Sequence, residues 1–452
     1  MIIDPVISVY ITNKNYGRYL ENAIKSVINQ TYKQKELIVI DDASTDKSKK
    51  IIKKYEAKNL CRAIYNRKTK GLIRSSNIAI KASKGKFVIR LDADDYLDPN
   101  ALSVLYNSIE KDTNIALAYS DYYLIDDKKN ILSLEKQVTR ISTSLEHKPV
   151  LAACCLIRKS SIFSVNLYDQ RFNVQDGYDI WYKLIQNFSV KHVPLPLFFY
   201  RRHQSNLTKN QVKLYKTRTK ILRKFAQQKN KIKNLNINCV IPVRGTNVDG
   251  LCNSLENFKK KPLIFYTIDE ALRVKEFKKI ILTTPDTKLI KLVKKKYKNN
   301  IFYQKRSENL SEQNLDYKES VINVVKKFNR SNIDIVVILT TENPFCKSFY
   351  IQQAISNLII HDSDMVIGTV PDIETNYYKY SKKGIELISN ERNQKLKLEK
   401  NTILKDVGAF HVYKYKSYLK NNINKITNIV LDEQHALTIN NKSDLLSANK
   451  LF

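Results

Sequence analysis

Carboxylates gather at two places in a chain whose formal net charge is +34. The stretch FVIRLDADDYLD (87–98) puts four Asp residues directly after an apolar run, and ELIVIDDASTD (36–46) puts three after another. Like charges this close repel one another and resist burial, so a positive partner is expected. Carboxylate oxygens suit Mg²⁺ or Mn²⁺, and an ion held in this way commonly also binds a phosphate group. The pattern therefore predicts a metal–diphosphate site.

Both acidic stretches follow strands in an alternating pattern of strands and helices. Strand-like runs cover 6–11, 36–40, 63–66 and 87–91, and helical spacing covers 17–30, 45–58, 73–83 and a segment from Pro99. This alternation predicts a parallel sheet covered by helices on both faces. Ligands of such sheets bind beyond the carboxyl ends of the strands, where both acidic stretches lie. If the strands 36–40 and 87–91 are neighbours, their carboxylates converge on one crevice.

Each acidic stretch taken alone also has a structural interpretation. DDASTD fits a turn and a helix N-cap, with Ser44 or Thr45 capping and Asp46 near the positive end of a helix. DADDYLDP fits a polar loop before a helix that starts at Pro99. Because the two stretches occur at matched positions, we favour the ligand site.

Near residue 235 the alternating pattern restarts. The second set of strand-like runs covers 236–243, 278–284, 333–341 and 364–370, with a helical run at 261–272. Between the two patterns, residues 209–234 contain no acid and are typical of a basic helix that leads into a linker. We therefore expect a first domain over 1–208, a basic helix and linker over 209–235, and a second domain over 236–452. A chain of 452 residues is long enough for two such cores.

The composition narrows the class of protein and its partners. The six cysteines form no CxxC pair, which is typical of reduced thiols, and no apolar run of about 18 residues predicts a spanning helix. The N-terminus shows no signal-peptide pattern, so we expect a cytoplasmic protein. Lysines are spread over almost every helix, which argues against nucleic acid as a partner. They favour peripheral contact with anionic lipid at the inner face of the membrane, or with an acidic polymer.

The first half resembles a known enzyme family. The blocks PVISVYITNKNYGRYLENAIKSVINQTYKQKELIVIDDASTD and GLIRSSNIAIKASKGKFVIRLDADDYLDP are similar to the nucleotide-diphospho-sugar transferases of glycosyltransferase family 2, over about residues 4–205. The resemblance implies a GT-A fold and transfer of a sugar with inversion at the anomeric carbon. It also implies that Thr12 and Asp42 border the nucleoside and that Arg74 lies near the donor.

The same resemblance assigns roles to the second acidic stretch. Asp92, Asp94 and Asp95 would hold the ribose and the divalent metal that bridges the diphosphate, with Asp94 and Asp95 as the metal ligands. A bound Mn²⁺ or Mg²⁺ would stabilise the charge of the departing nucleoside diphosphate as a Lewis acid. In the closing segment FFYRRH, Arg202 and His203 are expected to reach the diphosphate, or alternatively to be surface ion-pair partners.

An inverting transfer also needs a base that takes the proton of the acceptor hydroxyl. In the family an acidic block that ends in Leu-Trp supplies this base, and the matching stretch here is VQDGYDIWYKL (174–184). Asp176, five residues before Trp181, is the favoured base, and Asp179 is the reserve. The structural alternative is a solvent-facing Asp and a core Trp181 on one amphipathic helix.

The second half resembles the acylneuraminate cytidylyltransferases, which activate sialic-acid-like sugars with CTP. The resemblance starts at CVIPVRGTNVDGL and continues through VVILTTENPF to LTINNKSDLLSANKLF. In the family's phosphate-binding first loop, only Arg244 and Gly245 match. Residues without the expected positive charge occupy the remaining basic positions of this loop: Val248, Asp249 and Asn253. A triphosphate would lose its counter-charges there and meet a carboxylate instead.

A second loss lies at the family's late Asp-x-Asp, which holds the catalytic metal. It falls here on Thr438-Ile439-Asn440, and neither Thr438 nor Asn440 has the charge that Mg²⁺ binding needs. Asp432 is a substitute by chemistry but does not match by position. Because basic residues of the first loop and the metal-binding acids are both replaced, we expect the second domain to keep the fold without the catalytic activity. We expect a role in homo-oligomer assembly, since relatives of this domain commonly pair as dimers.

These inferences predict an α/β protein with two Rossmann-like, GT-A-type domains in tandem, each a mainly parallel sheet covered by helices. The expected function is a metal-dependent, inverting glycosyltransferase. It would move a sugar from a nucleotide-diphosphate donor to a hydroxyl of a glycan or lipid-linked acceptor, as in building a surface polysaccharide. The alternatives are a bifunctional transferase and CMP-sugar synthetase, or a non-catalytic basic binding or scaffold protein.

Overall fold

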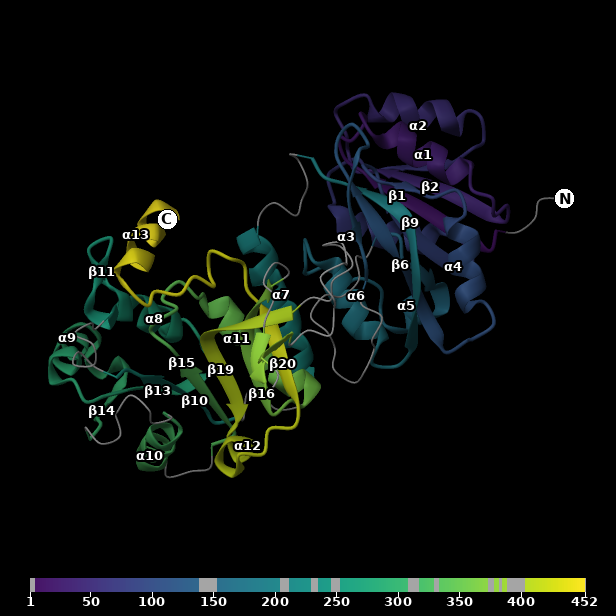
Figure 1. Cartoon of the computed structure of the whole chain (residues 1–452). Helices are drawn as coiled ribbons and strands as arrows, with labels where there is room; N and C mark the ends of the chain where they lie inside the picture. Colours follow the sequence, from purple (N-terminus) through teal and green to yellow (C-terminus); the bar gives the residue numbers. More distant parts are fainter. Residues whose placement is uncertain are drawn as a thin grey trace. The chain divides into compact units, whose positions relative to one another are not determined.

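The chain folds into two compact units, which a computed structural model shows in Figure 1. The division between them falls inside helix α7 (Gln211–Gln228), between Arg218 and Thr219. The residues that the structure describes are 5–137, 153–203, 211–228, 235–244, 253–307, 317–328, 333–372, 378–381, 384–387 and 403–451.

The first unit is built on a nine-stranded sheet ordered β3-β2-β1-β4-β8-β6-β9-β5, with β7 paired to β6. The strands are β1 (Ile7–Asn13), β2 (Lys35–Asp41), β3 (Arg62–Tyr65), β4 (Phe87–Asp92), β5 (Tyr96–Leu97), β6 (Ile115–Ile125), β7 (Ile131–Glu135), β8 (Leu156–Arg158) and β9 (Ser189–Arg201). Strands β1 to β4 run parallel to one another, whereas β8 is antiparallel to both β4 and β6. The parallel sheet that the alternating pattern predicted is therefore present.

Strand β1 separates the two strands that carry the acidic stretches. The condition that they are neighbours is not met, because β1 pairs with β2 on one side and with β4 on the other. Their carboxyl ends still lie at one edge, since Asp41 is level with Asn13 and Asp92 is level with Thr12. At a strand spacing of about 4.8 Å, the two acidic stretches start roughly 10 Å apart.

Helices of the first unit cover the two faces of the sheet. They are α1 (Leu20–Ile28), α2 (Ser48–Glu56), α3 (Leu72–Ala82), α4 (Ala101–Ile109), α5 (Lys159–Ser164) and α6 (Asp176–Leu184). The main core joins α1, α2 and α4 to alternate strand residues such as Val9 and Ile89. Because successive strand residues point to opposite faces, Tyr10 and Arg90 lie on the other face of the sheet.

The second unit repeats the architecture with a seven-stranded sheet ordered β14-β13-β10-β15-β19-β16-β20. These strands are β10 (Ile237–Pro242), β13 (Phe277–Thr284), β14 (Phe302–Lys305), β15 (Ile335–Leu339), β16 (Met365–Asp372), β19 (Ile403–Lys414) and β20 (Ile426–Val430). The first four strands of this order, β14, β13, β10 and β15, run parallel to one another. Strand β19 is antiparallel to β15 and β16. Two α/β units, each with a parallel core of strands, confirm the predicted fold class.

The remaining elements of the second unit surround this sheet. Its helices are α8 (Leu263–Leu272), α9 (Thr287–Tyr297), α10 (Lys318–Phe328), α11 (Ser348–His361), α12 (Tyr415–Lys420) and α13 (Lys442–Leu451), with 3₁₀ turns at Asn253–Leu255 and Lys298–Asn300. Two short hairpins are formed by β11 (Asn257–Phe258) with β12 (Lys261–Pro262) and by β17 (Tyr378–Ser381) with β18 (Gly384–Leu387).

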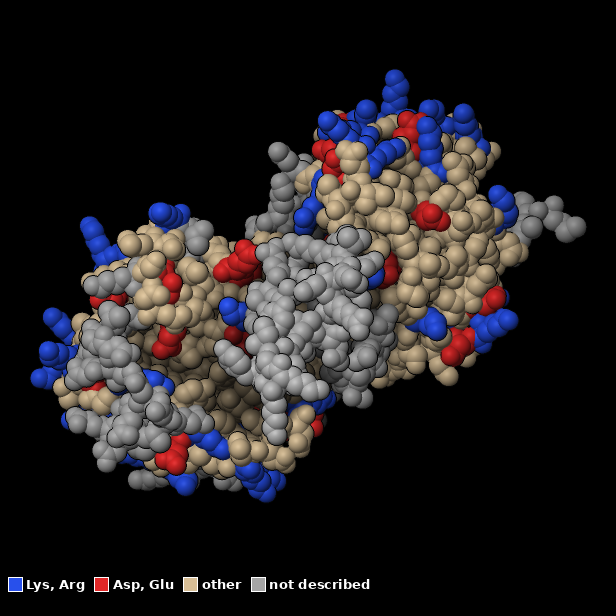
Figure 2. Space-filling view, viewed as in Figure 1, with Lys and Arg blue, Asp and Glu red and all other residues tan. Residues whose placement is uncertain are grey.

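Basic side chains are distributed over the visible surface of both units. Lysines also gather over α2 of the first unit, where Lys49, Lys50, Lys53 and Lys54 are exposed (Figure 2). In the part of the chain that the structure describes, no helix combines the length and the apolar character needed to span a bilayer.

Candidate functional site

Predicted donor and metal residues lie together at the carboxyl edge of β1 and β4. Thr12 pairs in register with Asp92, the last residue of β4. A turn follows, in which the Asp95 amide donates a hydrogen bond of 3.1 Å to the Asp92 carbonyl oxygen. This turn brings Asp94 and Asp95 to the same edge, so the structure unites four of the predicted residues.

Asp95 is the most deeply buried carboxylate of the turn, with 1% of its surface exposed. Its Oδ1 accepts a hydrogen bond of 2.9 Å from the Arg201 amide, whereas its Oδ2 is buried and accepts no hydrogen bond from any described residue. Burial raises the pKa of Asp95 well above its usual range, and the carboxylates of Asp94 and Asp92 add to the rise. A buried, repelled carboxylate oxygen of this kind is the atom that a bound cation would satisfy.

His203 contacts the acidic turn from the end of the first unit's last strand. Its Nε2 lies 2.9 Å from Asp94 Oδ2, and only 3% of its side chain is exposed. Its ring stacks on Tyr19 at a centroid distance of 5.1 Å and meets the edge of Tyr16 at 5.6 Å. Arg202, the other predicted residue of this segment, is exposed. Of the two, His203 is the one that reaches the acidic turn.

Arg201 is a site residue that the sequence interpretation missed. It is almost fully buried, and its Nε donates to the Asp94 carbonyl oxygen at 2.9 Å while Nη1 donates to the Asp126 carbonyl oxygen at 3.0 Å. Its guanidinium also lies over the Tyr19 ring, 5.0 Å from the centroid. Arg201 therefore holds the backbone of the acidic turn in place, next to the exposed Arg202, for which the sequence had left two roles open.

Arg90 was also missed, and it joins Asp92 to Asp176. Arg90 Nε lies 3.0 Å from Asp92 Oδ1, and Nη1 forms an ion pair with Asp176 Oδ2. Burial lowers the pKa of Arg90, but the two carboxylates outweigh it and raise this pKa well above its usual range. Burial raises the pKa of Asp92 to about 6; Arg90 opposes the rise, and Asp94 and Asp176 add to it. A charged residue inside the apolar run FVIRL was the sequence signal for this contact.

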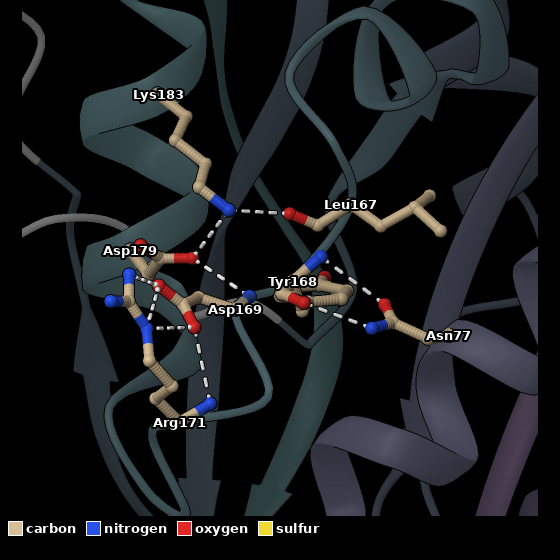
Figure 3. Close-up of polar contacts among 7 residues, drawn as sticks. All are labelled: Asn77, Leu167, Tyr168, Asp169, Arg171, Asp179 and Lys183. Carbon is tan, nitrogen blue, oxygen red and sulfur yellow. Dashed lines mark hydrogen bonds and ion pairs between the residues drawn. The ribbon is translucent and has the colours of Figure 1, made fainter.

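The two candidate bases occupy different environments. Asp176 is the first residue of α6, where the positive end of the helix dipole favours a carboxylate. Asp179 lies one turn later and is 1% exposed. Its Oδ2 accepts a hydrogen bond of 3.0 Å from the Asp169 amide and lies 2.8 Å from Lys183 Nζ (Figure 3). Asp176 therefore faces Arg90 of the acidic site, and Asp179 fixes a loop.

The loop that Asp179 fixes lies directly before α6. Lys183 Nζ donates to the Leu167 carbonyl oxygen at 2.6 Å. Asn77 of α3 donates to the Tyr168 carbonyl oxygen at 2.9 Å and accepts from the Tyr168 amide at 3.1 Å (Figure 3). These contacts tie the loop to α3 and α6 from both sides.

Asp42 and Arg74 are placed apart from the acidic turn. Both carboxylate oxygens of Asp42 accept hydrogen bonds of 2.8 Å, from the Lys70 and Gly71 amides, and Asn66 Nδ2 donates a further one at 2.9 Å. Gly71 has φ +86°, a conformation that favours glycine. Asp42 thus closes the loop before α3. Arg74 is exposed in the first turn of α3 and forms no ion pair with a described residue of the acidic turn.

The donor set of the acidic turn fits a divalent cation that is shared with a substrate. Among the described residues, no three His, Cys, Asp or Glu side chains form a group that could hold a metal by themselves. Asp94 and Asp95 offer two carboxylates, and Asp95 Oδ2 is buried without a described hydrogen-bond partner. Mg²⁺ is usually bound through one or two carboxylates together with waters and substrate phosphates. The two carboxylates match that pattern.

In the second unit, neutral groups stand at the two positions where the sequence resemblance implies metal-binding acids, Thr438 and Asn440. Thr438 Oγ1 accepts a hydrogen bond of 3.0 Å from Asn343 Nδ2, and the Asn440 amide donates to Asp444. Asp432 Oδ2 accepts from the Tyr350 hydroxyl at 2.9 Å and lies 2.7 Å from His435 Nδ1. Burial would raise the pKa of Asp432, but the contacts with His435 and Tyr350 lower it.

The first loop of the second unit is only partly within the described residues. Arg244 is exposed at its start, and together with burial it lowers the pKa of the neighbouring Arg306. Gly245, Val248 and Asp249 lie outside the described residues, as does the side chain of Asn253.

Two protein-family models each match part of the chain. The model described as glycosyl transferase family 2 matches residues 8–167. The first unit contains a family 2 glycosyl transferase region. A second model, described as cytidylyltransferase, matches residues 253–437. Both resemblances predicted from the sequence are confirmed, and the acidic turn and Arg90 lie within the family 2 region.

Curated relatives match this chain over part of their own length. The chondroitin synthase of Escherichia coli is 31% identical over 129 residues, which cover 28% of this chain and 19% of that protein. An uncharacterised glycosyltransferase of Rickettsia typhi is 31% identical over 196 residues, which cover 41% of this chain and 60% of that protein.

Among solved structures, Staphylococcus aureus TarS (residues 1–349) in complex with UDP-GlcNAc is similar with a TM-score of 0.41 and 16% identity. The match covers 48% of this chain and 66% of that one.

Proposed function

We propose that the first unit is a metal-dependent, inverting glycosyltransferase that moves a sugar from a nucleotide-diphosphate donor to a hydroxyl of a glycan or lipid-linked acceptor. The observation that carries this proposal is the convergence of Thr12, Asp92, Asp94 and Asp95 of the family 2 region with His203, which lies beyond it, at one sheet edge. A divalent ion at Asp94 and Asp95 would supply Lewis-acid stabilisation of the charge on the departing nucleoside diphosphate.

In this account the chain's own residues divide the work. Thr12 and Asp92, which are level on β1 and β4, bind the nucleoside end of the donor, and Asp42 and Arg74 border it. His203 sits 2.9 Å from Asp94 and orients that carboxylate. Asp176 accepts the proton of the acceptor hydroxyl, and Asp179 is reserved for the loop contact.

The acceptor and the cellular setting belong to the same proposal. A relative named chondroitin synthase supports a polysaccharide acceptor, at 31% identity over 28% of this chain. The exposed lysines of α2 support peripheral contact with an anionic membrane surface on the cytoplasmic side.

We further propose that the second unit is a cytidylyltransferase-like domain without catalysis, retained for assembly of the protein into a homo-oligomer. Support comes from the neutral Asn343–Thr438 pair and from Asp432, whose Oδ2 already contacts Tyr350 and His435. Neither arrangement offers the free carboxylates that a metal-bound triphosphate requires.

A turnover panel with the full chain tests both proposals. The panel contains UDP-, GDP- and dTDP-sugars and CTP with a sialic acid, each with Mn²⁺ and with EDTA, and it measures release of nucleoside diphosphate or pyrophosphate. We expect nucleoside diphosphate from one sugar donor only with Mn²⁺, and no pyrophosphate from CTP. Pyrophosphate without nucleoside diphosphate would contradict both proposals, and release of both products would identify a bifunctional enzyme.

A further inference from the structure

Arg90 is a buried charge in the middle of β4 to which the proposed roles assign nothing. Its neighbours Ile89 and Leu91 are fully buried in the main core, and Arg90 points to the opposite face with 5% of its surface exposed. Removing a guanidinium from water costs several kcal/mol unless it is paired and hydrogen-bonded. The pairing with Asp92 and Asp176 offsets that cost, so the three side chains form one unit.

The unit links two segments that lie 86 residues apart in the chain. Asp92 belongs to the proposed donor site and Asp176 is the proposed base. Arg90 reaches Asp92 through Nε and Asp176 through Nη1, on two sides of one rigid planar group. Asp176 is contacted at Oδ2, and its Oδ1 accepts no hydrogen bond from a described residue. One oxygen of the proposed base is therefore held by Arg90, and the other has no hydrogen bond to a described residue.

We propose that Arg90 is the positioning residue of the transfer reaction: its shared ion pair with Asp92 sets the orientation of Asp176. This inference rests on the proposed function of the first unit. The inference adds that one cation, Arg90, contacts both the donor site and the base. Loss of Arg90 would therefore disturb the base, although Arg90 touches neither substrate.

Four titratable side chains besides Arg90 act electrostatically with Asp176. They are Tyr10 of β1, Asp92 of β4, Cys155 next to β8 and Tyr168 of the loop before α6. Burial raises the pKa of Tyr10 and of Cys155 to about 12, and that of Tyr168 well above its usual range. The phenols and the thiol stay neutral between pH 6 and about pH 9. Arg90 is thus the cation that acts on Asp176, and Asp92 is the other group of this set that carries a charge in this pH range.

The test is the pH profile of kcat for the full chain with its donor and Mn²⁺. In Arg90→Met, Asp176 is no longer held in place, so we expect kcat to fall by about 100-fold across the whole profile. Arg90→Lys restores the charge and should return kcat to near its wild-type value. Arg90→Gln replaces Arg90→Met if that variant does not fold.

Arg158 is the matched control. Its guanidinium is half-buried and donates to the Ile109 and Asp112 carbonyl oxygens at 2.8 and 3.0 Å, away from the acidic turn. Arg158→Met should lower stability without moving the kcat profile. A profile that moves equally in Arg158→Met and Arg90→Met, or in neither, overturns the positioning role.

A second readout separates failure of this inference from failure of the proposed function. Urea unfolding followed by the fluorescence of Trp181, the single Trp of the chain, reports on α6 in the first unit. Non-additive midpoints for Arg90→Met and Asp176→Asn would show that the pair exists in solution. Coupling with an unmoved kcat profile overturns the positioning role and leaves the transferase intact. If the wild type turns over no sugar donor, the proposed function fails and the positioning role fails with it.

Discussion

Asp176→Asn is expected to lower kcat for sugar transfer by about 10²–10⁴, which is the usual contribution of a general base. Asn keeps the shape of Asp but cannot take a proton from the acceptor hydroxyl. Donor affinity should stay within a few-fold of wild type, since Asp176 reaches the donor residues only through Arg90. Steady-state kinetics combined with calorimetric donor binding separates the two effects.

Asp179→Asn is the matched control, three residues away on the same helix. It should leave kcat within a few-fold of wild type at a temperature where the variant is folded. Its cost is structural: Lys183 and the Asp169 amide lose a buried carboxylate (Figure 3). We expect a loss of roughly 3 kcal/mol in the free energy of unfolding of the first unit, because one partner of a buried ion pair is removed. A large fall in kcat for Asp179→Asn with little change for Asp176→Asn would reverse the assignment.

Asp92→Asn is expected to stabilise the metal-free first unit at pH 8 by at most roughly 3 kcal/mol, since Arg90 loses one partner but keeps its ion pair with Asp176, while it abolishes donor binding. Burial, with Asp94 and Asp176 adding to it, raises the pKa of Asp92 from 3.8 to about 6. A shift of about two units corresponds to roughly 3 kcal/mol at 1.36 kcal/mol per unit. Three quarters of the Asp92 side chain is buried, with 26% exposed, so solvent screens this energy only in part.

The sign of this effect follows from linkage. A carboxyl whose pKa is higher in the folded than in the unfolded protein stabilises the fold below about pH 4, and this contribution is lost as the pH rises through about 6. Wild-type stability in EDTA should therefore decline between pH 4 and 7 more steeply than that of Asp92→Asn. Mn²⁺ should reduce the difference, since a cation relieves the same repulsion. Midpoints of urea unfolding, followed by the fluorescence of Trp181, measure this difference in stability.

Asp98→Asn is the control from the same acidic stretch. Asp98 Oδ1 accepts a hydrogen bond of 2.8 Å from the Asn100 amide at the start of α4, where the carboxylate stabilises the fold. Because an Asn side-chain oxygen can accept the same bond, Asp98→Asn should keep stability within about 0.5 kcal/mol of wild type. An Asp92→Asn protein less stable than wild type in EDTA at pH 8 would contradict the repulsion that the site implies.

Much of the fold could be predicted because the signal was local. Apolar runs such as ELIVI and FVIRL mark β2 and β4 within a residue or two of their observed bounds. The order of the strands is non-local, and the placement of β1 between β2 and β4 could not be deduced from the runs themselves. The two acidic stretches are therefore separated by one strand. Asp42 binds the loop before α3 and does not reach the acidic turn.

The candidate site was predicted best where residues are close in sequence. Asp92, Asp94 and Asp95 share one turn, and their spacing was sufficient to predict it. His203 approaches Asp94 across 109 residues of sequence, and only the family resemblance indicated it. Arg90 and Arg201 were missed because the role of a buried Arg can be assigned only when its contact partners are known, and most of these lie far away in the sequence. Asp176 and Asp179 could not be separated by residue type, whereas the start of α6 separates them.

The central claim is that the acidic turn binds a nucleoside diphosphate through a divalent metal. The most direct measurement is isothermal titration calorimetry of UDP, GDP and dTDP into the full chain, with Mn²⁺ or EDTA, for wild type, Asp94→Ala and the control Asp98→Asn. We predict binding of one diphosphate that requires Mn²⁺, is lost in Asp94→Ala and persists in Asp98→Asn. Binding that is indifferent to both Mn²⁺ and Asp94, or no binding of any diphosphate, would contradict the account.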